Sequence, residues 1–340
     1  MVKLSHFPRV VLTQAPTPLQ HLPRLSRLLG GPEIYIKRDD NTGLALGGNK
    51  TRKLEFLLGD ALAKGATHIV TQGARQSNHV RQTVAAATAL GLRTTVLLEE
   101  RIPNTDDDYD HNGNVLLDRI FGAVIEARPS GLDMNHELVA IGERLQAAGE
   151  VPYLIPGGGS NAIGALGYVE SAQELLQQIN QQQLDVHHVV HATGSTGTQA
   201  GLVVGLQGNN SHIPVLGISV RAPRDRQIEN VTKLARQTWE LLEIRGEFPA
   251  DTVEANADYV GEGYGIPTPA TLEALFLLAR TEGILLDPVY SAKGFAGLLD
   301  YVRKGIFKAG QNIVFIHTGG AAALPGYRNI LERYAAVYEN

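Results

Sequence analysis

Hydrophobic positions along the chain follow two alternating patterns. Short runs of β-branched and aliphatic residues predict strands at 33–37, 68–72, 94–99, 123–127, 152–155, 187–192, 214–220 and 312–317. Between most of them, apolar residues recur every three or four positions and predict helices at 54–62, 134–148, 162–178, 226–242 and 268–281. Such alternation is typical of an α/β fold in which parallel, twisted sheets are flanked by helices.

Weaker signals suggest how the chain is divided. The acidic segment 103–110 (PNTDDDYD) is expected to be a solvated loop, and the glutamine-rich segment 177–183 to be a helix end with a surface turn. A length of 340 residues accommodates two α/β units. We expect a small domain at 50–165 and a large, cofactor-binding domain formed by 1–49 and 166–340.

Composition narrows the possible functions. The net charge is −5 and no basic cluster occurs, so we expect no nucleic-acid partner. No apolar stretch approaches the roughly 18 residues of a membrane span, so we expect a soluble, cytoplasmic protein without a membrane partner. The absence of cysteine excludes disulfides, thiolate metal sites and a thiol nucleophile. The histidines lack metal-ligand spacing, and no metal site is expected.

A lysine at the start of a predicted helix is the first candidate for chemistry. Segment 47–53 (GGNKTRK) places Lys50 after two glycines, which let the backbone approach a ligand closely. The helix dipole disfavours a cation at this end, and Arg52 and Lys53 add positive charge. Cationic neighbours and burial lower the pKa of an amine and favour its nucleophilic form. Lys50 is therefore a reactive lysine or, alternatively, an ordinary solvated one.

Two strand-to-helix turns predict anion binding. In segment 76–79 (QSNH), Ser77 and Asn78 supply a side-chain helix cap and free backbone N–H groups that suit a carboxylate, although an ordinary helix cap explains Ser77 or Asn78 singly. Ser77 and His79 do not face each other on a helix, so they form no nucleophile pair. The second turn suits a phosphate and is neither a P-loop nor GxGxxG. It comprises Thr193, Gly194, Ser195, Thr196, Gly197 and Thr198.

Three hydroxyl side chains in glycine- or proline-rich segments complete the candidates. Tyr264 in GEGYG and Tyr290 in DPVY could act as acid, base or stacking groups, although most loop tyrosines do neither. Thr318 ends a predicted strand before two glycines, where its hydroxyl could meet a ring nitrogen.

In order, these segments resemble the pyridoxal-phosphate enzymes of the tryptophan-synthase-β type, called fold type II. The resemblance is closest to the branch of D-cysteine desulfhydrase, L-cysteate sulfo-lyase and 1-aminocyclopropane-1-carboxylate deaminase, and it extends from about Phe7 to Tyr327. The motifs that carry it are APTPL at 15–19, IKRDD at 36–40, GGNKTRKLEF at 47–56, QSNH at 76–79, GGGSNAIGALGY at 157–168, ATGSTGTQAGL at 192–202, GEGYG at 261–265, EGILLDPVYSAKG at 282–294 and HTGG at 317–320.

The resemblance implies a role for each candidate. Lys50 would carry pyridoxal phosphate covalently and then move the Cα proton of the substrate. Asn78 would contact the ring hydroxyl, while Ser77, Asn78 and His79 would hold the substrate carboxylate. The loop 193–198 would bind the phosphate, and the two tyrosines would line the reacting face. Thr318 would bond the ring nitrogen without protonating it, which moderates the electron sink and favours β-elimination.

The resemblance leaves the substrate open. The deaminases carry Glu directly after the second tyrosine, where this chain has Ser291, which disfavours ring opening. Arg221, Arg224 and Arg226 could pair with a sulfonate or form a solvated basic loop. A sulfonate pocket would use Arg221, Ser291 and backbone N–H groups, whereas a D-cysteine pocket would have Tyr290 facing the sulfur with no arginine nearby. We expect a homodimeric carbon–sulfur lyase of small amino acids, with D-cysteine slightly ahead of L-cysteate because a thiol pocket needs fewer special residues. A non-catalytic cofactor-binding protein would not need the carboxylate clamp or the tyrosines.

Overall fold

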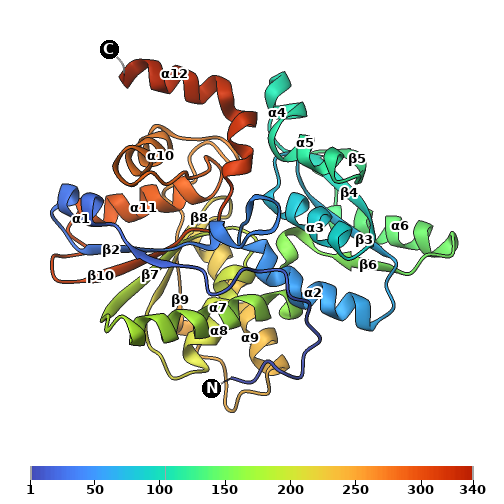
Figure 1. Ribbon diagram of the computed structural model, residues 1–340, viewed down its shortest axis with the longest axis horizontal. Coiled ribbons are helices and arrows are strands. Elements are labelled where there is room, and N and C mark those ends of the chain that lie inside the picture. Colours follow the sequence, from blue (N-terminus) through green and yellow to red (C-terminus); the bar gives the residue numbers. More distant parts are fainter. Residues whose placement is uncertain (1, 104, 339–340) are drawn as a thin grey trace.

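The computed structural model describes residues 2–103 and 105–338, which form two sheets with helices on both faces (Figure 1). The larger sheet has the order β1-β2-β10-β7-β8-β9, and all of its pairs are parallel except β1 with β2. Its strands are β1 (Leu19–His21), β2 (Glu33–Lys37), β10 (Asn312–Ile316), β7 (Val186–Thr193), β8 (Val215–Ser219) and β9 (Val253–Asn256).

Two apolar layers cover the larger sheet. One contains α1 (Pro23–Leu29), α10 (Pro269–Glu282) and α11 (Ser291–Arg303). The opposite layer contains α7 (Ala162–Gln181), α8 (Gly197–Gln207) and α9 (Arg224–Leu241). The central strands are buried on both sides, which explains why they read as continuous hydrophobic runs in the sequence.

The smaller sheet has the parallel order β5-β4-β3-β6. Its strands are β3 (His68–Ala74), β4 (Arg93–Glu100), β5 (Val124–Pro129) and β6 (Pro152–Ile155). Helices α2 (Lys50–Ala63), α3 (Asn78–Ala89) and α5 (Gly113–Ile120) pack on one face, and α6 (Met134–Ala147) packs on the other. The division of the chain into domains at 50–165 and at 1–49 with 166–340 stays a prediction.

The predicted α/β fold with parallel sheets is confirmed, and each predicted strand is present within two residues of its expected ends. Hydrophobic patterning did not indicate β1, β9 or α11, because two of these are very short and the third begins in a glycine-rich motif. The solvated loop expected at 103–110 is wrong in its second half. There α4 (Asp107–His111) forms because Asp106 caps it and Tyr109 is buried against Tyr327.

Two further findings concern partners. Within the described ranges, no helix is long and apolar enough to cross a membrane. Nor do His, Asp and Glu side chains of those residues gather in a group of three or more that could hold a metal ion.

The last described helix, α12 (Arg328–Tyr338), follows the final strand of the larger sheet.

Candidate active site

A cavity of about 500 Å³ lies where the carboxyl ends of strands from both sheets converge. Ligands of open α/β sheets usually bind at this edge. The cavity brings together nearly all of the residues that the sequence singled out, namely Lys50, Ser77, Asn78, His79, Thr193, Gly194, Ser195, Thr196, Thr198, Tyr264, Tyr290 and Thr318. Gly197 is not part of the lining, because its N–H group is turned toward Ser160 Oγ at 3.2 Å.

Lys50 reaches the cavity because of the glycine pair before it. Gly47 and Gly48 have φ values of 68° and 127°, and a Cβ on Gly47 would lie 1.8 Å from the carbonyl oxygen of Asp40. The Lys50 amine donates to Asn49 Oδ1 at 3.0 Å. Burial lowers the pKa of Lys50 to about 8, and the negative charge of Asp287 only partly opposes this effect. The neutral, nucleophilic form of this amine is therefore far more accessible at neutral pH than that of an ordinary lysine, although the protonated form still predominates.

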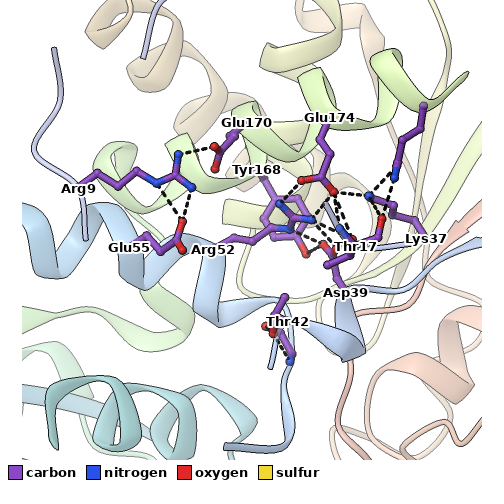
Figure 2. A network of polar contacts seen from close by, with 12 residues as sticks. Arg9, Thr17, Lys37, Asp39, Thr42, Arg52, Glu55, Tyr168, Glu170 and Glu174 are labelled. Atoms are coloured by element: carbon purple, nitrogen blue, oxygen red, sulfur yellow. Dashed lines mark hydrogen bonds and ion pairs between the residues drawn. The ribbon is translucent and has the colours of Figure 1, made fainter. Parts of the chain in front are cut away.

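The opposite side of α2 is held by a buried ionic cluster, defined here as Lys37, Asp39, Arg52, Tyr168 and Glu174 (Figure 2). The Arg52 guanidinium donates to both oxygens of Asp39 at 2.9 and 3.0 Å and to Glu174 at 2.8 and 3.1 Å. Lys37 also pairs with Glu174, and the Tyr168 hydroxyl donates to Asp39 at 2.6 Å. This cluster joins α2 to β2 and α7 and fixes the helix that carries Lys50.

Lys53 is a binding candidate that sequence reasoning treated only as a neighbour of Lys50. It lies one turn after Lys50, is fully buried, and donates to the carbonyl oxygen of Gly158 at 3.1 Å. Burial and then the charge of Lys50 hold its pKa well below the usual value. No carboxylate of the described residues pairs with it. The i, i+3 spacing from Lys50 along the helix was the signal that could have identified it.

The loop 193–198 lies beside these two amines at the N-terminus of α8. A Cβ on Gly197 would come within 2.9 Å of Lys53 Nζ, so the loop and the lysine are in direct contact. Thr196 has a φ of 68°, and Asn49 Nδ2 holds Thr198 Oγ1 at 2.9 Å while Gln227 Nε2 holds Thr193 Oγ1 at 2.8 Å. Helix N–H groups together with buried cations make a strong anion site.

A second helix N-terminus faces the cavity at Ser77–His79. Ser77 caps α3 by accepting the Val80 N–H at 3.2 Å. The His79 ring has its Nε2 at 2.8 Å from Thr71 Oγ1 and its Nδ1 facing Thr83, so its nitrogens are occupied. Burial, with Lys50 and Lys53 nearby, keeps the pKa of His79 well below its usual value. Backbone N–H groups and the Ser77 hydroxyl are thus the groups left for a carboxylate.

Tyr264 and Tyr290 form a hydroxyl pair at the cavity wall, with 2.5 Å between their oxygens. Arg101 lies over the Tyr264 ring, 5.3 Å from its centroid. Asp287 fixes the loop of Tyr290 by accepting the N–H groups of Val289 and Tyr290, each at 3.0 Å. Burial raises the pKa of both tyrosines, which keeps the pair protonated at neutral pH.

The structure places the candidate sulfonate-binding residues in different environments. Arg221 lines the cavity. Arg224 and Arg226 instead pair with Asp225 and Glu229 on the surface. Ser291 is buried and donates to Asp287 at 2.6 Å, so the expectation that it could cradle a sulfonate is not supported by its position. Sequence reasoning also missed two residues that line the cavity at the carboxyl end of β4. Glu99 is near the last position of the strand, and Arg101 follows it.

Comparison with known proteins identifies the family. The model of the pyridoxal-phosphate dependent enzymes matches residues 10–319. The chain belongs to this family. A solved structure described as an ACC deaminase homologue is 40% identical, with a TM-score of 0.88 and 97% of each chain covered. A threonine deaminase from T.th. is 20% identical with a TM-score of 0.63, covering 89% of this chain and 92% of that one. O-ureido-L-serine synthase is 18% identical with a TM-score of 0.65 and 92% coverage of both chains.

Pyridoxal phosphate is therefore the cofactor of this fold type II enzyme, and the cavity fits it. Two buried amines without sufficient carboxylate partners lie beside a helix N-terminus, and a phosphate dianion would neutralise them. Lys50 would hold the cofactor covalently, and Lys53 with the 193–198 loop would hold its phosphate. When bound, this cofactor withdraws electrons from the substrate Cα.

Proposed function

We propose that the enzyme catalyses α,β-elimination from a small amino acid with an anionic β-substituent, with L-cysteate as substrate. The observation that carries this proposal is Arg221, an exposed residue that lines the cavity and lies close enough to Tyr264 for its charge to act on that side chain. A sulfonate spreads its charge over three oxygens, and burying it without a cationic partner costs several kcal/mol. The products are sulfite, pyruvate and ammonia.

Each step is assigned to side chains of this chain. Ser77 and the N–H groups that begin α3 bind the substrate carboxylate, which orients the Cα–H bond toward Lys50. The Lys50 amine takes this proton, and the Cβ–S bond breaks as its electron pair leaves with the sulfonate. The Tyr264–Tyr290 pair and Arg221 stabilise the departing anion. Water then hydrolyses the released enamine to pyruvate and ammonia.

D-cysteine desulfhydration is the second candidate, and one observation favours it. Arg101 donates to Glu99 at 2.5 Å, so this arginine is already paired and is not free to meet a sulfonate. The expectation that favoured D-cysteine also required a pocket without an arginine, which Arg221 does not meet. The relative described as an ACC deaminase homologue makes 1-aminocyclopropane-1-carboxylate a third substrate to test.

A side-by-side assay separates these substrates. Pyruvate release is measured from L-cysteate, D-cysteine and L-cysteine, and ammonia release from 1-aminocyclopropane-1-carboxylate. We expect kcat/KM for L-cysteate to exceed that for D-cysteine by more than tenfold. The reverse ratio would replace the proposal with the desulfhydrase, and turnover of the cyclopropane alone would replace both.

Arg221→Ala tests the reason for the preference. Losing a charge-assisted contact, worth about 1.5–3 kcal/mol, should lower kcat/KM for L-cysteate by roughly 10- to 100-fold and leave D-cysteine turnover nearly unchanged. Arg224→Ala is the matched control, because Arg224 begins α9 three residues after Arg221 and is paired on the surface. Equal losses in both variants, or for both substrates, would contradict a sulfonate contact at Arg221.

A further inference from the structure

A buried asparagine outside the cavity contacts Asn78, the residue expected to bind the ring hydroxyl of the cofactor. Asn114 lies in the first turn of α5 with no exposed surface, and it is not part of the cavity lining. Its Nδ2 donates to Asn78 Oδ1 at 3.0 Å and to the carbonyl oxygen of Gln76 at 3.2 Å. Asn114 therefore links α5 to the segment that was predicted to hold the cofactor and substrate.

The polarity of this contact is fixed by carbonyl groups. The Gln76 side chain donates to the carbonyl oxygens of Tyr109 and Asn112 at 2.6 and 2.9 Å, so its Oε1 accepts the backbone N–H of Asn114 at 2.9 Å. The side-chain amide of Asn114 faces the backbone carbonyl oxygen of Gln76, and because a carbonyl can only accept, the amide must direct its NH₂ group there. The same NH₂ group also faces the side chain of Asn78, which can accept this hydrogen bond only through its Oδ1.

The contact with Asn114 determines which end of the Asn78 amide faces the cavity. An amide presents its oxygen and its NH₂ group in opposite directions, and Asn78 lines the cavity. With Oδ1 engaged by Asn114, the Asn78 NH₂ group is the part left for a bound molecule. No hydrogen-bond acceptor among the described residues takes it.

We infer that Asn114 is a positioning residue that fixes Asn78 as a hydrogen-bond donor toward the ring oxygen of the cofactor. This inference rests on the predicted contact between Asn78 and that oxygen and not on the identity of the substrate. A donor stabilises the anionic form of the oxygen, which lowers the pKa of the proton held between this oxygen and the Lys50 nitrogen. An Asn78 turned the other way would present an acceptor and raise that pKa.

Asn114→Asp is the decisive variant, because a carboxylate can only accept and would draw the Asn78 NH₂ group away from the cavity. The measurement is a pH titration of the absorbance of the bound cofactor in the holoenzyme. We expect its apparent pKa to rise by about one unit, which is a tenfold change in the proton equilibrium. Asn209→Asp, the same change at a distant site between α8 and β8, should leave the titration unchanged.

A double-variant cycle separates positioning from a general structural role. In the Asn78→Ala background, Asn114→Asp should produce no additional shift, because the amide through which it acts is missing. An equal shift in both backgrounds, or none in either, would overturn the inference. If Asn114→Asp retains no cofactor, Asn114→Ala decides by the same criterion, with a smaller rise expected because both orientations of Asn78 become accessible. None of these spectra requires turnover, so they remain valid if the proposed substrate is wrong.

Discussion

The two sides of α2 carry buried cations under opposite conditions. On the side away from the cavity, Arg52 is enclosed by Asp39 and Glu174 and has carboxylate partners for its guanidinium (Figure 2). On the side that faces the 193–198 loop, Lys53 has one backbone carbonyl as its hydrogen-bond partner. Burial alone would lower the pKa of both, but Asp39 and Glu174 raise that of Arg52 well above its usual value, whereas Lys50 depresses that of Lys53 further.

Within the fourteen residues of α2, the difference in pairing distinguishes a cation that stabilises the fold from cations that are available to a ligand. A buried ion pair with complete hydrogen bonding is satisfied by the fold itself. A buried amine without a counter-charge destabilises the protein unless an anion arrives from outside. We therefore propose that the unpaired cations of α2 meet the bound cofactor, whereas the paired one holds the helix in place.

Removing the reactive amine is expected to have the largest effect. Lys50→Ala should lower elimination by several orders of magnitude, because proton transfer by a positioned base alone contributes about 10²–10⁴-fold and the covalent hold on the cofactor is also lost. Pyruvate release measures this loss. Borohydride reduction of the wild-type holoenzyme, followed by peptide mapping, should place the label on Lys50. A label on Lys53 would contradict the assignment.

Breaking the ionic cluster is expected to cost the fold more than the chemistry. Arg52→Met leaves Asp39 and Glu174 without their main cation, and loss of one partner of a buried pair costs about 3–5 kcal/mol of unfolding free energy. Urea denaturation of the cofactor-free protein measures this cost. The expected order of events is loss of stability first and loss of activity as its consequence.

Lys53→Met is the matched comparison on the same helix. Because Lys53 has no carboxylate partner among the described residues, its removal should not destabilise the cofactor-free protein. It should weaken binding of pyridoxal phosphate by roughly 10- to 100-fold, the worth of a hydrogen bond between charged groups. Equal destabilisation in Lys53→Met and Arg52→Met would erase the distinction between the two sides of α2.

The sequence predicted much of this arrangement, for reasons that differ between the two sides. Glycine spacing and helix starts indicated the positions of Lys50, Ser77 and the 193–198 loop, because these depend on local backbone geometry. In contrast, Lys37 and Asp39 of the motif IKRDD form ion pairs with residues of α7 and α2, which local backbone geometry does not indicate. Partners far apart in the chain, such as Arg52 with Glu174 or Asn78 with Asn114, have no periodicity that a single sequence could display.

The unpaired amine also predicts how stability depends on pH once the cofactor is removed. The pKa of Lys50 is about 8 in the folded protein and 10.5 as the ordinary value, so the unfolded chain binds more protons between these limits. Stability should therefore rise from about pH 8 to pH 10.5, by about 3 kcal/mol for this group. Lys50→Met should make that part of the curve less steep, while Lys53, whose pKa is also lowered, continues to contribute to the rise. Parallel curves for both proteins would exclude Lys50 as the titrating group.

The smallest expected effect belongs to Thr318, which lines the cavity just after the end of β10. If its hydroxyl makes one neutral hydrogen bond to the ring nitrogen, that bond is worth about 1 kcal/mol. Thr318→Val keeps the shape of the side chain, so the unfolding midpoint should stay unchanged while the dissociation constant of pyridoxal phosphate rises about fivefold. Thr318→Asp would place a carboxylate against the nitrogen, favour its protonation and strengthen the electron sink. A Thr318→Asp enzyme with an unaltered ratio of elimination to other reactions at Cα would show that the ring nitrogen lies elsewhere in the cavity.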